Sequence, residues 1–92
     1  MIKSVRHKGL KRFLDAGDAS GVKADHRKRL RMQLAALDTA TTIEDMDIQG
    51  FRLHELKGRR ADTWAINVSG NWRLTFRFRD GHVYDLDYED YH

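Results

Sequence analysis

Two histidines, a carboxylate, a phenol and a group of arginines in this chain could together cleave RNA. His54 lies in a strand-like stretch, and Asp90, Tyr91 and His92 end the sequence. Attack by the 2′-hydroxyl of RNA needs a base for the hydroxyl proton, an acid for the departing 5′-oxygen and cations for the phosphorane charge. Imidazole suits both proton transfers because its pKa lies near neutrality. DNA lacks the 2′-hydroxyl and could not react in this way.

Arginines on one face of a predicted strand are candidates for RNA binding. Arg73, Arg77 and Arg79 share this face, on which side chains follow one another every ~6.6 Å. This step approximates the spacing of successive phosphates, and guanidinium groups suit phosphate oxygens. The alternative is that Arg77 pairs with Asp85 and Arg73 with Glu89 in cross-strand ion pairs.

The remaining histidines predict neither a metal site nor a cofactor. His7, His26 and His82 fall at expected helix starts and turns, where we expect them to be solvated. No two histidines show the spacing of zinc ligands, and the chain has no cysteine. We therefore expect chemistry without a metal or cofactor.

Charge is divided unevenly along the 92 residues, which are enough for one domain spanning residues 1–92. Residues 80–92 contain five acidic residues and no lysine or arginine, which leaves residues 1–79 with 17 bases against nine of the 14 acids, a net charge of +8. Such a basic body is typical of a protein with a polyanionic partner such as nucleic acid, and equally of a charged surface that only keeps the protein soluble. No apolar run approaches the ~18 residues of a membrane span, and no signal peptide is apparent. We expect a cytoplasmic protein that does not bind membranes.

Hydrophobic periodicity predicts two N-terminal helices. Leu10, Phe13 and Leu14 recur at helical spacing, and the breaker cluster 15–21 ends that helix. The second helix is expected to start at Asp25 as N-cap and to bury Leu30, Leu34 and Leu37. Residues 2–5 are a candidate edge strand, and residues 38–50 are a connector.

From residue 51 onward the apolar residues alternate, which predicts strands over residues 51–54, 64–68, 72–79 and 84–88. Strand register must keep the apolar residues on one face. A three-residue 80–82 loop achieves this by pairing Phe78 with Tyr84, Phe76 with Leu86, and Leu74 with Tyr88. A 69–71 loop likewise pairs Val68 with Trp72 and Ile66 with Leu74, so both hairpins need an odd loop or a bulge. The predicted fold is α+β, with two N-terminal helices on one face of a small, mainly antiparallel twisted sheet and an arginine-rich polar opposite face.

Three segments, "LHELKG", "NWRLTFRF" and "DGHVYDLDYEDYH", make the whole chain resemble the HigB-type toxins of the RelE/ParE superfamily. The resemblance implies a single RelE-like microbial RNase fold and a ribosome-dependent mRNA endonuclease that cuts mRNA in the A site without a metal, inhibiting translation. It implies as partners the ribosome (30S A site and 16S rRNA), mRNA and a HigA-like helix-turn-helix antitoxin, with operator DNA bound only through the antitoxin.

By position, the resemblance assigns catalytic roles to His54, Asp90, Tyr91 and His92, and places Lys57 and Arg73 near the scissile phosphate. Either histidine could be the base, Asp90 would orient or charge-tune a histidine, and Tyr91 would stack on a base or transfer a proton. Strict alternation puts Asp90 and His92 on the Trp72 face. These two residues can join the site only if the strand ends or bulges after about residue 88.

This chain also departs from its relatives. Many of them carry an arginine in the turn before Asn-Trp-Arg, where this chain has Ser69 in "VSGN". Either one phosphate contact is missing, or Arg59 and Arg60 supply it.

Two other functions remain open at this stage. A non-catalytic RNA- or ribosome-binding module would use the same basic face. A ParE-like gyrase inhibitor is disfavoured because such proteins typically lack this His/Asp/Tyr/His set.

Overall fold

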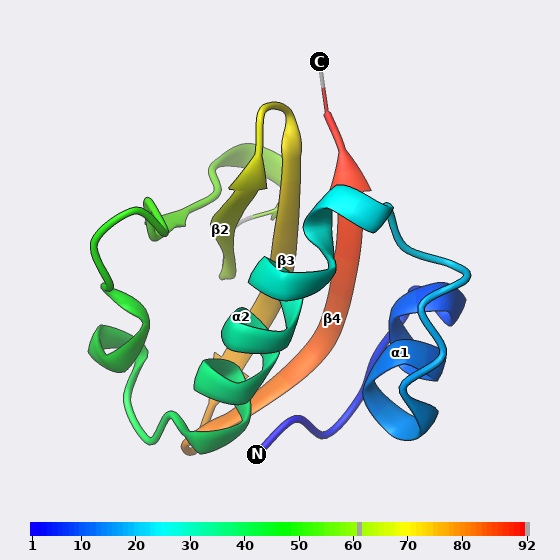
Figure 1. Ribbon diagram of the computed structural model, residues 1–92. Coiled ribbons are helices and arrows are strands. Elements are labelled where there is room, and N and C mark those ends of the chain that lie inside the picture. The colour runs from blue at the N-terminus through cyan, green and yellow to red at the C-terminus, as the bar shows by residue number, and fades with distance from the viewer. Residues whose placement is uncertain (61, 92) are drawn as a thin grey trace.

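The computed structural model describes residues 1–60 and 62–91, with residue 59 described by its backbone alone. Two helices, α1 (Lys8–Ala16) and α2 (Arg27–Thr39), precede the four strands (Figure 1). The strands are β1 (His54–Glu55), β2 (Thr63–Ser69), β3 (Trp72–Arg79) and β4 (His82–Asp90). Short 3-10 turns cover Ala24–His26 (η1), Ile43–Met46 (η2) and Gly58–Arg60 (η3). The predicted α+β class is confirmed.

Both helices form where the apolar spacing predicts them, but their first turns differ from expectation. His7 caps α1, since its Nδ1 accepts a hydrogen bond from the Leu10 N–H at 3.0 Å. Gly17, in the left-handed conformation at φ 73°, ends the helix as the breaker cluster predicts. The predicted Asp25 cap is wrong: Asp25 lies inside η1, and α2 begins at Arg27.

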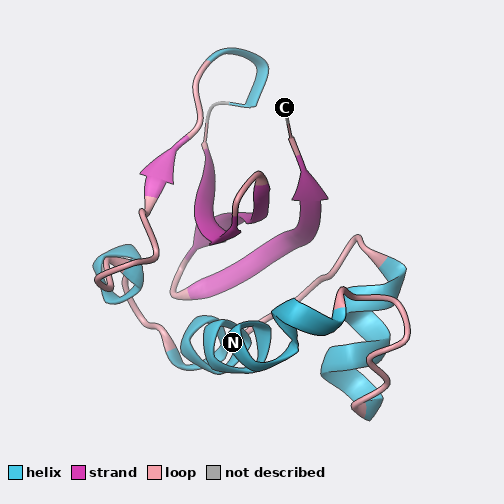
Figure 2. Cartoon of the chain, turned by 45° about the horizontal axis from the view of Figure 1, so that its top comes forward, coloured by secondary structure: helices cyan, strands magenta, loops and turns pink. Residues whose placement is uncertain are grey.

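The sheet is antiparallel in the order β1-β2-β3-β4. Ile2 and Val5 form isolated parallel bridges to Val83 and Leu86, so the predicted edge strand at residues 2–5 joins β4 without becoming a regular strand. β1 is shorter than the strand predicted over residues 51–54, because Arg52 has φ 54° and interrupts the extended backbone. Figure 2 shows the helices on one side of this sheet.

The register of the β3–β4 hairpin combines a two-residue turn with a bulge. Asp80 and Gly81 form the turn with φ values of 53° and 78°, and Phe78 pairs with Val83. The predicted pairs Phe78–Tyr84 and Arg77–Asp85 are therefore wrong, whereas the predicted Phe76–Leu86 pair falls at the register shift between Thr75 and Arg77 and stays a prediction. A register shift at Asp85, which has φ 54°, restores the alternation, so the predicted pairs Leu74–Tyr88 and Arg73–Glu89 are confirmed.

The β2–β3 hairpin follows the same pattern. Its turn is Gly70–Asn71, and Ser69 pairs with Trp72, so the predicted Val68–Trp72 pair is wrong while Ile66–Leu74 is confirmed. The register shifts between Asn67 and Ser69. From α2, Arg29 Nη2 and Gln33 Nε2 donate to the Asn67 carbonyl at 3.2 and 2.8 Å, so the helix supplies donors to the backbone of the bulge.

The core lies between the helices and the sheet. Its largest fully buried apolar side chains come from both layers and from the connector: Phe51, Phe76, Leu10, Leu30, Leu37, Met46, Ile66, Leu74, Leu86 and Val83. Leu34 is also buried, as predicted, whereas Leu14 remains 36% exposed. Within residues 1–60 and 62–91, no helix has the length and apolarity needed to span a membrane.

Candidate active site

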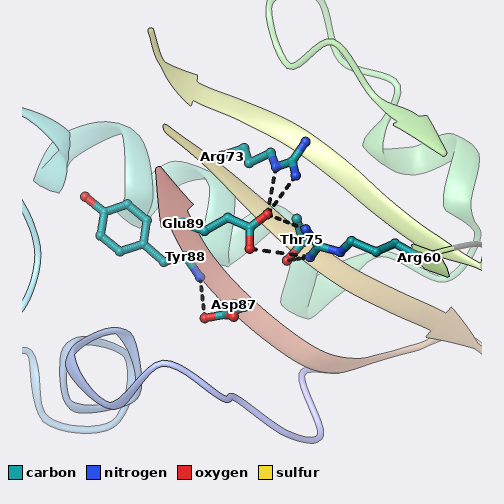
Figure 3. Close-up of polar contacts among 6 residues, drawn as sticks. All are labelled: Arg60, Arg73, Thr75, Asp87, Tyr88 and Glu89. Carbon is teal, nitrogen blue, oxygen red and sulfur yellow. Dashed lines mark hydrogen bonds and ion pairs between the residues drawn. The ribbon is translucent and has the colours of Figure 1, made fainter. Parts of the chain in front are cut away.

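The polar face of the sheet, opposite the helices, carries a cluster of four side chains that we call the Glu89 cluster: Glu89, Arg60, Arg73 and Thr75 (Figure 3). Arg73 and Glu89 are directly paired across β3 and β4. Thr75, on the same face of β3, is 2% exposed. Arg60 reaches this face from η3, so the cluster joins three segments of the chain.

Glu89 accepts hydrogen bonds from both arginines. Its Oε1 accepts from Arg60 Nη1 at 2.7 Å and from Arg73 Nε and Nη2, each at 2.8 Å. Arg60 Nη2 also donates to Glu89 Oε2 at 3.4 Å and to Thr75 Oγ1 at 3.3 Å. Partial burial alone would raise the pKa of Glu89, but the hydrogen bonds and charges of Arg60 and Arg73 outweigh burial and lower it. Glu89 is therefore ionised at neutral pH.

Tyr91 extends the Glu89 cluster toward the end of the chain. The guanidinium carbon of Arg73 lies 3.9 Å from the centre of the Tyr91 ring, a cation–π contact. The Tyr91 backbone N–H donates to the Asn71 carbonyl at 3.0 Å, which fixes this residue beside the β2–β3 turn. Tyr91 is 48% exposed, so its ring is accessible to a ligand.

His54 lies on the same polar face, as the alternation predicts. His54 pairs with Ala65 of β2, and Ala65 pairs with Thr75 of β3. Thr75 is two residues from Arg73 and therefore on the same face of β3. His54 Nδ1 is 2.8 Å from the Arg52 carbonyl oxygen. A carbonyl only accepts, so Nδ1 carries a hydrogen, and in the neutral ring Nε2 is the nitrogen with a lone pair. An exposed imidazole in this tautomer can take a proton through Nε2.

The other predicted site residues are less closely assembled. Asp90 pairs with Trp72, and β4 keeps its register from Asp87 to Asp90, so Asp90 belongs to the Trp72 face. The bulge that would move Asp90 to the Arg73 face is absent from this described stretch of β4. Lys57 is exposed just before η3. His92 and the Arg59 side chain lie outside the described residues.

Arg77 and Arg79, the outer arginines of β3, lie beside Tyr84 of β4. Arg77 pairs with Tyr84, not with Asp85, because of the bulge. The Arg79 guanidinium carbon lies 5.1 Å from the centre of the Tyr84 ring. Both arginines are exposed, so a basic, partly aromatic surface continues along β3 beyond the Glu89 cluster.

Comparison with known proteins shows which family the chain resembles. A family model described as "RelE-like toxin of type II toxin-antitoxin system HigB" matches residues 3–92. The chain belongs to this family. The curated protein "Endoribonuclease HigB" of Proteus vulgaris is 50% identical to this HigB-like toxin over 92 residues, which is the full length of both chains. A toxin of a type II system has an antitoxin as its partner.

Two features of this HigB-like toxin were not predicted from the sequence. Arg60 belongs to the Glu89 cluster, but it comes from a segment without strand or helix periodicity, so no pattern connects it to Glu89. His26 was expected to be solvated, yet it is 4% exposed and its Nδ1 lies 2.6 Å from the Tyr88 hydroxyl. The sequence signal for this burial was its position four residues before Leu30, which is one helical turn along the apolar face of α2. His7 and His82 are half-buried, not fully solvated.

Histidine and carboxylate side chains do not converge on a metal site in the described part of the toxin. In residues 1–60 and 62–91, no group of three or more such side chains could hold a metal ion. What this part of the chain does bring together is a histidine with an orienting carbonyl, a phenol and several guanidinium groups.

Proposed function

We propose that this toxin is a ribosome-dependent mRNA endonuclease that cleaves mRNA in the ribosomal A site through attack by a 2′-hydroxyl, and so inhibits translation. Full-length identity of 50% to an endoribonuclease is the observation that carries the proposal. The polar face adds support because an imidazole with an accepting Nε2 and a guanidinium on a phenol ring lie on one accessible surface.

In this mechanism His54 is the base. Its Nε2 removes the 2′-hydroxyl proton while the Arg52 carbonyl holds Nδ1–H. His92, which follows β4, is then the candidate acid for the 5′-oxygen, and Asp90 would orient or charge-tune it from the Trp72 face at the end of β4. Arg73 and Lys57 stabilise the phosphorane, and Tyr91 stacks on a base of the mRNA.

The partners follow from this reaction. Arg77, Arg79, Arg60 and Arg59 bind the RNA backbone, and the ribosome supplies the substrate in the 30S A site next to 16S rRNA. The antitoxin is a HigA-like helix-turn-helix protein, and operator DNA is bound only through it. Such a substrate places the toxin in the cytoplasm.

Primer extension on translating ribosomes tests the proposal. Wild-type toxin should produce discrete cuts in the message, and His54→Ala and deletion of His92 should each reduce cutting by at least ~10²-fold, the scale of one lost proton transfer. His82→Ala, at the opposite end of β4, is the matched control and should cut like wild type. Unchanged cutting by both active-site variants would show that the assignment is wrong.

A non-catalytic RNA-binding module is the second candidate, favoured by the exposed Arg77 and Arg79 beside the half-buried Tyr84. It predicts salt-sensitive RNA binding with no cut in any message. Cuts in ribosome-bound mRNA that are absent from naked RNA would exclude both this module and a general ribonuclease.

A further inference from the structure

The Glu89 cluster places a carboxylate between two arginines of the polar face, where its negative charge opposes the binding of an RNA phosphate. We propose, on the basis of the proposed function, that Glu89 is a positioning residue: it holds Arg60 beside Arg73 and directs both guanidinium groups toward one phosphate of the bound RNA. Arg60, which belongs to η3, is then the second cation of the site beside Arg73.

Glu89 itself is unsuited to proton transfer. Four N–H groups of two arginines lie within hydrogen-bonding distance of its two oxygens. A carboxylate engaged in this way stays ionised and so has no proton to donate, and three N–H groups already occupy its Oε1. Its role is therefore to orient its partners.

Arg60 and Arg73 would separate without the carboxylate. Arg60 Nη1 and Arg73 Nη2 contact the same oxygen of Glu89 at 2.7 and 2.8 Å. Two like charges held so close are stabilised only by an anion between them, and the trio keeps a net charge of +1. Thr75 also holds Arg60 in place, because the hydroxyl of this buried residue accepts a hydrogen bond from Arg60 Nη2 (Figure 3).

Each guanidinium group keeps a nitrogen that contacts neither Glu89 nor Thr75, namely Nε of Arg60 and Nη1 of Arg73. Arg73 contacts Glu89 through Nε and Nη2, so Nη1 lies on the opposite edge. The Arg60 side chain is 41% exposed and that of Arg73 is 13% exposed. Because Arg73 also lies over Tyr91, fixing Arg73 fixes the Tyr91 ring as well.

Glu89→Gln tests this role because it removes the charge and keeps the shape. The released guanidinium groups should bind RNA several-fold more tightly, with a steeper salt dependence, because the site gains one positive charge. Single-turnover cleavage on ribosomes should nevertheless fall about tenfold to a hundredfold, because the two cations and Tyr91 lose their orientation. Binding and cleavage therefore change in opposite directions.

Three comparisons sharpen the result. Glu44→Gln on η2 removes the same charge far along the chain and should change neither quantity. Arg60→Met should weaken binding and cleavage together, and Glu89→Gln should add little to the cleavage defect in an Arg60→Met background. Glu89→Asp, which keeps the charge, should recover part of the cleavage rate. Thermal unfolding and complex formation with the antitoxin report whether each variant folds.

Several results would overturn the inference. Equal or faster cleavage by Glu89→Gln would show that Glu89 only masks the arginines. A parallel loss of binding, cleavage and melting temperature in both Glu89 variants would show a purely structural role, and wild-type cleavage by Arg60→Met would remove the second cation. If wild-type toxin cleaves no message, the proposed function fails and this inference fails with it. If wild type cleaves and Glu89→Gln cleaves equally well, only this inference is overturned.

Discussion

At the scale of single residues, a buried histidine links the helical layer to the end of β4 that carries the candidate site. The His26 ring contacts both Trp72 and Tyr88, with centroid distances of 5.6 and 5.9 Å. The Tyr88 hydroxyl accepts from the Lys23 N–H at 3.3 Å and lies 2.6 Å from His26 Nδ1, to which it can donate when Nδ1 of a neutral ring carries no hydrogen. Burial first, and then the charge of Lys23, lower the pKa of His26 below 6.5.

This histidine predicts how the stability of the toxin depends on pH. Below pH 6.5 the unfolded chain protonates His26 while the folded chain does not, so the free energy of unfolding should fall as the pH drops from 6.5 toward the lower folded pKa. Urea unfolding at pH 7.5 and 5.5 measures the change. His26→Gln should show a smaller pH dependence than wild type, whereas exposed His54→Gln should retain it. Equal pH dependence in wild type and His26→Gln would contradict the prediction.

At the scale of elements, two bulges decide which side chains share a face. The alternation of apolar residues correctly predicted the strands from Thr63 onward, the helices, and the Arg73–Glu89 pair. It also showed that each hairpin needs an odd loop or a bulge, without deciding between them. In the β3–β4 hairpin, the bulge depends on left-handed backbone at Asp85 and on a hydrogen bond from the Asp85 N–H to Ser4 Oγ at 2.8 Å. Ser4 lies eighty-one positions away in the sequence, so no local pattern contains this contact.

The candidate site, like the strand register, was predicted only in part from the sequence. Strand alternation placed His54 and Arg73 on one face, but the contribution of Arg60 depends on how the irregular segment after β1 folds back over the sheet. Tyr84 was assigned to the core, yet the bulge turns it toward Arg79 on the polar face. Long-range packing, not local preference, sets both positions.

The bulge at Asp85 yields a prediction for stability. Asp and Asn tolerate φ 54°, whereas a β-branched side chain is strained there. Asp85→Val should therefore lower the free energy of unfolding by about 1–2 kcal/mol, and Asp85→Asn should change it by less than about 0.5 kcal/mol. Urea denaturation compares them. A Val variant as stable as wild type would mean that β4 can pair without this bulge.

At the scale of the whole molecule, Met1 lies beside the start of β4 and Tyr91 follows its other end, and Figure 1 shows the N-terminus at the lower end of this strand. The Val83 N–H donates to the Met1 carbonyl at 3.0 Å, whereas Tyr91 is fixed to Asn71 at the other end. The eight residue-to-residue steps from Val83 to Tyr91 span roughly 26 Å of extended backbone. The acidic residues of β4 are also not a separate tail, because Glu89 is paired with two bases of the body.

This separation predicts that the two ends tolerate fusion differently. An uncharged tag placed after His92 begins next to Tyr91 and would obstruct the approach of mRNA to Arg73, while a tag before Met1 begins near the β3–β4 turn. Growth arrest after induction should therefore be reduced at least ~10-fold more by the first fusion, a loss on the scale of misplacing catalytic groups. Immunoblotting must show equal toxin levels, and antitoxin co-expression should restore growth in both strains. Equal growth arrest by the two fusions would mean that the surface around Tyr91 and Arg73 is not the one that meets the ribosome.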